Sequence, residues 1–213
     1  MKTEELIESL AGDFRPVRRL PGPASTALML TVFSLLLAVA GAALMGWRAD
    51  LAPRLSDPRF WLVTALLLLV CATGETVLAI LAVPGRRGSL LGTRVGVVLL
   101  VAAAGVLLSR APWIGISPGL RWLGLGLFCT GRAVLVGVVP IAGGLWYLRR
   151  GASVHPGRSG AMLGLVGGLL GAFALQWSCD LVEAAHVLIW HILVPGMLLG
   201  LIGAWLGRRW LRW

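Results

Sequence analysis

Long runs of apolar residues, separated by short segments rich in arginine, dominate the pattern along this chain of 213 residues. A helix needs roughly 20 apolar residues to cross the hydrocarbon core of a membrane. The runs predict six such helices, at residues 24–46, 60–83, 95–112, 122–147, 160–178 and 184–207. They are continuous and do not alternate with polar residues, which favours helices over the strands of a β-barrel. We therefore predict an all-α, polytopic membrane protein with six transmembrane helices.

Composition and charge agree with this prediction and orient it. Hydrophobic residues make up 58% of the chain and charged residues 13%, against about 25% charged residues in soluble domains. Thirteen of the 19 basic residues fall in the N-terminal segment, after the second and fourth predicted spans, and at the C-terminus. Since cytoplasmic loops are enriched in lysine and arginine, both termini are expected in the cytoplasm. Topology and contact with anionic lipid then explain the net charge of +10, and direct binding of nucleic acid is not expected.

The chain divides into an N-terminal segment (residues 1–22), a transmembrane domain (23–207) and a basic tail (208–213). The N-terminal segment predicts one short amphipathic helix that is acidic in its first turn and is followed by arginines. It is either a membrane-surface helix with a basic anchor, or a helix that binds a groove on a cytoplasmic protein. The candidate partner-binding residues are Leu6, Ile7, Leu10, Arg15, Arg18 and Arg19.

Ionisable residues at membrane depth are costly, so each one is a functional candidate. Glu75 lies in the second predicted span, Arg132 in the fourth and His191 in the sixth. Glu75 and Arg132 could form a buried ion pair that fixes the packing of their helices. Alternatively, the three residues form a polar path, and the protein is a small membrane transporter or metal-efflux component.

The segment CDLVEAAHVLIWH, at the start of the sixth predicted span, is denser in such residues. On an α-helix, Cys179, Glu183, His186 and Trp190 share one face, and His191 lies about 100° away from it. Thiolate, carboxylate and imidazole are ligands for a soft or borderline metal ion. Alternatively, the two histidines are not metal ligands and only make hydrogen bonds between helices.

Cys129, in the fourth predicted span, is expected at a depth similar to that of Cys179, near the non-cytoplasmic edge. Two thiols at this place could form a disulfide or bind a metal ion together, and both options stay open. The candidate metal ligands are Cys129, Cys179, Glu183 and His186. Since Cys-x-x-Cys, HExxH, P-loop and Ser–His–Asp motifs are all absent from the sequence, we do not expect an enzyme.

Several segments in order resemble the NrsF-type membrane anti-sigma factors. They are MKTEELIESLA with RPVRRLP, DPRFW before the second span, VPGRR after it, LRRGASVHPG after the fourth, the late CD…AHVLIWH, and the tail GRRWLRW. The resemblance covers the whole chain. It implies a bacterial inner-membrane protein that holds an extracytoplasmic-function (ECF) sigma factor inactive through its N-terminal segment. Release is expected when a heavy metal or oxidant engages two periplasm-side cysteines, which correspond here to Cys129 and Cys179.

The expected partners are therefore an ECF sigma factor and the lipid membrane. No cofactor is expected to be bound permanently, and a soft or borderline metal ion is expected only as the signal.

Overall fold

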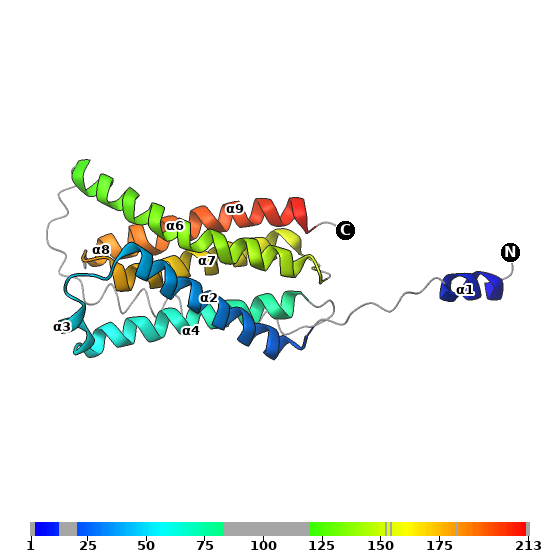
Figure 1. Ribbon diagram of the computed structural model, residues 1–213. Coiled ribbons are helices and arrows are strands. Elements are labelled where there is room, and N and C mark those ends of the chain that lie inside the picture. The colour runs from blue at the N-terminus through cyan, green and yellow to red at the C-terminus, as the bar shows by residue number, and fades with distance from the viewer. Residues whose placement is uncertain are drawn as a thin grey trace.

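The computed structural model describes residues 3–12, 21–82, 120–151, 153, 155–181 and 183–211, and every secondary-structure element in these ranges is a helix (Figure 1). The helices are α1 Thr3–Gly12, α2 Pro23–Met45, α3 Leu51–Leu55, α4 Pro58–Leu81, α6 Leu120–Leu148, α7 Pro156–Ser178, α8 Ala184–His186, η1 Val187–Leu193 and α9 Val194–Trp210. Pro58 and Pro156 stand in the first turns of their helices, where the amide that proline lacks has no partner within the helix.

Five helical segments are long and apolar enough to cross a membrane, and the last of them combines η1 and α9. They cover Ala24–Met45, Pro58–Leu81, Trp122–Leu148, Pro156–Ser178 and Val187–Trp210. Each lies within a few residues of a predicted span, so the all-α fold and these five apolar helices are confirmed. The predicted span at 95–112 lies outside the described residues. The end of α4 and the start of α6 lie at opposite ends of the bundle, and residues 83–119 connect them (Figure 1).

Helix α7 is the centre of the bundle and packs against α2, α4, α6 and α9. Its glycines allow close approach of backbones, as small residues do at helix contacts in membranes. A Cβ atom at Gly168 would lie 2.6 Å from the Cα of Gly196 in α9, and one at Gly137 in α6 would lie 2.6 Å from the carbonyl oxygen of Gly167. At these positions the backbone of α7 approaches the backbones of α6 and α9 directly.

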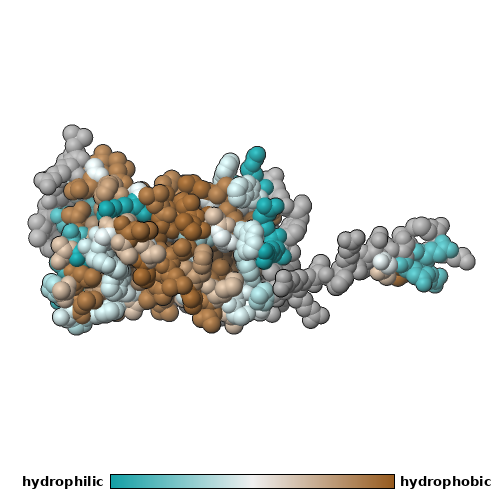
Figure 2. Space-filling view, viewed as in Figure 1, coloured by the Kyte–Doolittle hydropathy of each residue, from teal (hydrophilic) through white to brown (hydrophobic). Residues whose placement is uncertain are grey.

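The outer surface of the bundle is apolar. On α2, the least buried of the five helices, Leu28, Leu36 and Leu44 are 66%, 64% and 89% exposed. Figure 2 shows hydrophobic residues across the middle of the visible face and more polar ones toward its ends. Such a continuous apolar surface is unfavourable in water and matches the hydrocarbon layer of a membrane.

Candidate functional site: a thiol and imidazole cluster

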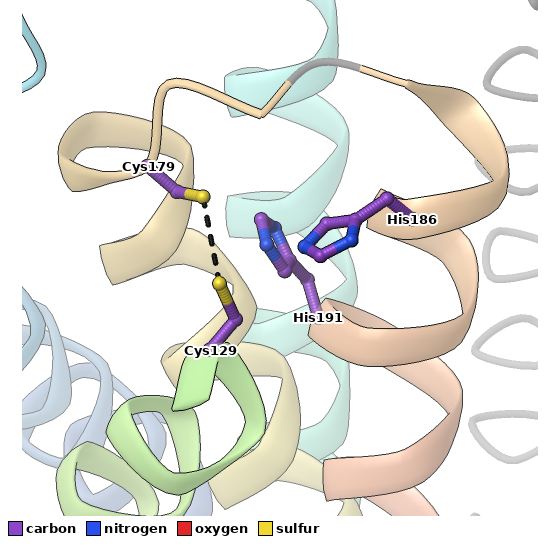
Figure 3. A group of neighbouring side chains, drawn as sticks. All are labelled: Cys129, Cys179, His186 and His191. Atoms are coloured by element: carbon purple, nitrogen blue, oxygen red, sulfur yellow. Dashed lines mark hydrogen bonds between the residues drawn. The ribbon is translucent and has the colours of Figure 1, made fainter. Parts of the chain in front are cut away.

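Four buried side chains from separate parts of the chain meet near one end of the bundle (Figure 3). Cys129 comes from α6, Cys179 follows the last residue of α7, His186 ends α8 and His191 lies in η1. Their sulfur and nitrogen atoms all lie within 4.8 Å of one another. We call these four residues the thiol–imidazole cluster.

The two thiols are free and lie side by side. The sulfur atoms of Cys129 and Cys179 are 3.7 Å apart, well beyond the roughly 2.05 Å of a disulfide bond. At Cys179 the backbone leaves the helix and becomes extended, which turns the thiol toward α6. The hydrogen bond with Cys129, helped by the neighbouring His186 and His191, lowers the pKa of the Cys179 thiol against the opposing effect of burial. The pair therefore favours a thiolate, the form that attacks oxidants and binds metals.

A π-helical turn places the two histidines together. In a π-helix each amide bonds to the carbonyl five residues earlier, so residues five apart lie on roughly the same side of the helix, whereas in an α-helix they do not. His186 precedes this turn and His191 lies in it, and their ring centroids are 5.2 Å apart. The prediction that His191 points away from the face of His186 is wrong, because it assumed α-helical periodicity throughout. Both imidazoles are buried, and in the described part of the chain neither Nε2 atom has a hydrogen-bond partner.

Pro195 and Thr130 explain why the π-helical turn lies where it does. The amide of Val194 donates to the carbonyl of Ile189, five residues earlier. In the same pattern residue 195 would donate to Trp190, but proline has no amide hydrogen. The Thr130 hydroxyl of α6 donates to the Trp190 carbonyl instead, at 2.9 Å. This bond fixes η1 against α6 directly beside Cys129.

Trp190 packs against α6 beside the thiol–imidazole cluster. Its side chain is buried, and its ring lies 5.3 Å from that of Trp122, measured between centroids. A Cβ atom at Gly126 would collide with the Trp190 ring, so only glycine leaves room for this contact. The Trp122 ring also lies 6.4 Å from the His186 ring, measured between centroids, so the aromatic pair packs beside the cluster.

The turn that carries Cys179 is also attached to the end of α2. The buried Arg48 donates from its backbone amide to the Trp177 carbonyl at 3.1 Å, and from its guanidinium to the Gln176 carbonyl at 3.2 Å. The amide of Ala49 donates to the Asp180 carboxylate at 2.9 Å. Residues on both sides of Cys179 are thus bonded to the loop that follows α2, and we call this connection the Arg48 clasp. Nothing in the hydropathy pattern indicated it.

The structure places the other candidate residues away from the cluster. Glu183 is exposed and does not belong to the group. Glu75 is buried beside a cavity of about 240 Å³, whereas Arg132 is only partly buried and lies over the Phe128 ring at 4.5 Å. Within the described ranges the ion pairs join Asp50 to Arg48 and Arg54, so the interpretation of Glu75 and Arg132 as an ion pair is wrong.

The N-terminal candidates are described only in part. Leu6, Ile7 and Leu10 lie in α1, where Ile7 is 61% exposed. Arg15, Arg18 and Arg19 lie outside the described residues.

The fold and the cluster define a helical protein of the membrane-spanning type, with a pair of buried thiols near one end of its bundle. Residues 10–213 match the NrsF family, described as negative regulator of sigma F. The anti-sigma-F factor NrsF of Caulobacter vibrioides (strain NA1000 / CB15N) is 31% identical over an alignment of 229 positions, gaps included, which covers all of both chains. No solved structure matches the chain. The chain belongs to the NrsF family.

Proposed function

We propose that this protein is an inner-membrane anti-sigma factor that holds an ECF sigma factor through its cytoplasmic N-terminal segment. A heavy-metal ion or an oxidant engages Cys129 and Cys179 on the periplasmic side, and the sigma factor is released. The observation that carries the proposal is the match to the negative regulators of sigma F along nearly the whole chain. The role is regulatory and needs no catalytic group.

Helix α1 supports a role in partner binding. It has ten residues, with Glu4 and Glu5 in its first turn and an exposed Ile7. A helix this short is marginal in water and gains stability when its apolar face enters a groove on a partner. Leu6 and Leu10 follow the spacing of such a face with Ile7, and the arginines at 15, 18 and 19 add positive charge for an acidic rim.

The distribution of charge supports a cytoplasmic position for both ends of the chain. The end of the bundle where α2 begins also holds the end of α6, the start of α7 and the end of α9 (Figure 1). Its described basic residues are Arg149, Arg150, Arg158, Arg208 and Arg209. At the opposite end, which holds the thiol–imidazole cluster, Arg48 and Arg54 are paired with Asp50, whose carboxylate offsets part of their charge. By the positive-inside rule the cluster then faces the periplasm.

The Arg48 clasp supplies a physical route from the thiols to the N-terminal segment. An ion that draws the four ligands of the cluster together, or a disulfide that brings the two sulfur atoms from 3.7 Å to about 2.05 Å, shifts the end of α7 that carries Cys179. The clasp passes this displacement to the end of α2, whose other end directly follows the N-terminal segment. A tenfold loss of sigma-factor affinity needs about 1.4 kcal/mol of coupling between the two sites.

The transporter alternative gains no support from the described residues. Of the side chains that line the cavity beside Glu75, only Ser34 and Tyr147 are also polar. His191 belongs to the thiol–imidazole cluster instead. A polar path through Glu75, Arg132 and His191 would need a connection that these contacts do not provide.

The first test is retention of a sigma factor from cell extract by the protein in detergent. The full-length chain and a chain without residues 1–20 are compared. We expect the sigma factor only with the full-length chain. If neither chain retains a sigma factor, the anti-sigma proposal fails. If both retain it equally, the N-terminal segment is not the binding site.

The second test concerns the thiols. Cys129→Ser with Cys179→Ser should abolish induction by metal or oxidant and leave repression intact. Cys71→Ser is the matched control, because Cys71 is also buried in the bundle but lies outside the cluster. Full induction in the double variant would remove the two thiols from the mechanism.

A further inference from the structure

We propose that Cys129, Cys179, His186 and His191 form a four-ligand site for one divalent ion of the Zn²⁺ and Cd²⁺ class. The two histidines are then ligands, and the π-helical turn exists to bring them to the thiols. Binding of the ion stands on the geometry alone. The further step, that this ion is the signal, rests on the function proposed above.

The distances fit a tetrahedral site that is nearly closed. With Zn–S bonds of about 2.3 Å and Zn–N bonds of about 2.0–2.1 Å, a tetrahedron has ligand atoms about 3.3–3.8 Å apart. The two sulfur atoms already stand at 3.7 Å, the separation expected across such an ion. All four ligand atoms lie within 4.8 Å of one another, and the widest pair, which includes a nitrogen, has to approach by roughly 1–1.5 Å.

The histidines have the state expected of ligands. Buried imidazoles in proteins normally have hydrogen-bond partners, because burial removes those that water would supply. Here the Nε2 atoms of His186 and His191 are both buried and, among the residues described, both lack a partner. Figure 3 shows the two rings beside the two sulfurs, on the same side of the cluster. A metal ion would satisfy both rings at once.

The local backbone also points to a site. Single π-helical turns are uncommon and occur frequently at functional sites. Two contacts with α6 stabilise this π-helical turn: the Thr130 hydroxyl donates to the Trp190 carbonyl, and the Trp190 ring packs against Gly126, where a larger residue would collide with it. An α-helical course would separate the two histidines around the helix, and the cluster would lose one nitrogen ligand.

The charge and chemistry of the ligands select the ion. Two thiolates and two neutral imidazoles carry a total charge of −2, which neutralises a divalent cation. A buried site that is poor in water favours such a neutral complex over a charged one. Any proton still held by the two thiols leaves to solvent on binding. Sulfur and imidazole nitrogen suit zinc and cadmium, whereas calcium and magnesium require oxygen ligands. Glu183, the exposed carboxylate nearby in sequence, is not needed.

The test is metal binding by the reduced, metal-free, full-length protein in detergent. Co²⁺ is added first, because tetrahedral thiolate sites give visible d–d bands, and Zn²⁺ then displaces it. We expect one ion per chain. His186→Asn and His191→Asn should each weaken metal binding by more than about 100-fold. Loss of a residue that only hydrogen-bonds a metal-bound histidine already lowers metal affinity by about 10- to 100-fold, and loss of the ligand itself should cost more. Cys71→Ser and Glu183→Gln should bind as the wild type does.

A second measurement does not depend on how the variants fold. X-ray absorption of the zinc-loaded wild type should show two sulfur and two nitrogen neighbours. Absence of binding, a sulfur-only or oxygen-rich shell, or undiminished binding in both histidine variants would overturn the proposal. So would a wild type that oxidants convert to a Cys129–Cys179 disulfide but that never binds zinc.

Sigma-factor retention is measured separately, with and without Zn²⁺ or Cd²⁺. If the ion binds as described and the sigma factor stays bound, the site stands and its role as the signal fails. If the metal-free protein retains no sigma factor, the proposed function fails and the site is unaffected.

Discussion

The hydroxyl of Thr130 holds the π-helical turn in place, so Thr130→Val is a direct test of how the cluster is built. Valine keeps the shape and the β-branch of threonine but cannot donate to the Trp190 carbonyl. Pro195 supplies no amide to that carbonyl either, so the oxygen is left buried and unpaired. Such a group costs about 1–3 kcal/mol in soluble proteins, while hydrogen bonds between membrane helices average about 0.6 and reach about 1.7 kcal/mol. We expect a loss of about 1–2 kcal/mol.

The assay is unfolding of the detergent-solubilised protein by titration with SDS, followed by tryptophan fluorescence. Thr130→Ser keeps the hydroxyl, so its free energy of unfolding should fall much less than that of Thr130→Val. Thr73→Val is the matched control elsewhere, because the Thr73 hydroxyl donates to the Leu69 carbonyl, which already accepts an amide of its own helix. Equal losses in Thr130→Val and Thr73→Val, or in Thr130→Val and Thr130→Ser, would refute the reasoning.

Three other predictions follow from the packing and the charges. Gly164→Ala drives a Cβ atom into the Leu199 carbonyl and should lower the free energy of unfolding by about 1–3 kcal/mol in the same titration. The Cβ atom added by Gly124→Ala meets open space, so this variant should be neutral or stabilising. Similar effects at the two sites would contradict the prediction. Arg48→Gln weakens the attachment of α2 to the end of α7, so under the proposed function metal should release the sigma factor at least threefold less while repression persists; undiminished release would exclude this route. Hydrogen bonding to Arg48 lowers the pKa of Asp50 to about 2, so the stability lost in Asp50→Asn should be present above pH of about 4 and vanish as the pH falls toward 2; a difference that is constant with pH in thermal unfolding would contradict it.

The hydropathy pattern was sufficient for the membrane helices that the structure describes, because span length is set by bilayer thickness and not by tertiary contacts. It also predicted that Cys129 and Cys179 lie at similar depth, since Cys129 is a few residues inside the fourth predicted span and Cys179 directly follows the fifth, near the same edge. Depth does not specify rotation about a helix axis. The contact between the two sulfurs depends on α7 ending at Ser178 and on the extended backbone at Cys179, neither of which a periodicity reveals.

The position of His191 could not be derived from helical periodicity. A π-helical turn changes the angular position of every residue after it. A helical wheel drawn with α-helical periodicity therefore places His191 on the wrong face of the helix. The one signal in the sequence was Pro195, which stands inside the predicted sixth span and must leave a carbonyl unpaired upstream. That the free carbonyl is used by Thr130, 60 residues earlier in the chain, requires the three-dimensional packing of α6.

Helix α2 has a further consequence, which concerns the lipid. It is the least buried of the five candidate spans, and it joins the N-terminal segment at one end to the Arg48 clasp at the other. Its 23 residues are about 34 Å long, slightly more than the hydrocarbon thickness of about 30 Å. A helix with few neighbours meets a thinner bilayer by tilting, and the tilt moves both of its ends. Under the function proposed above, acyl-chain length acts on this protein together with metal, and vesicles of different thickness should give different sigma-factor affinities at the same metal concentration.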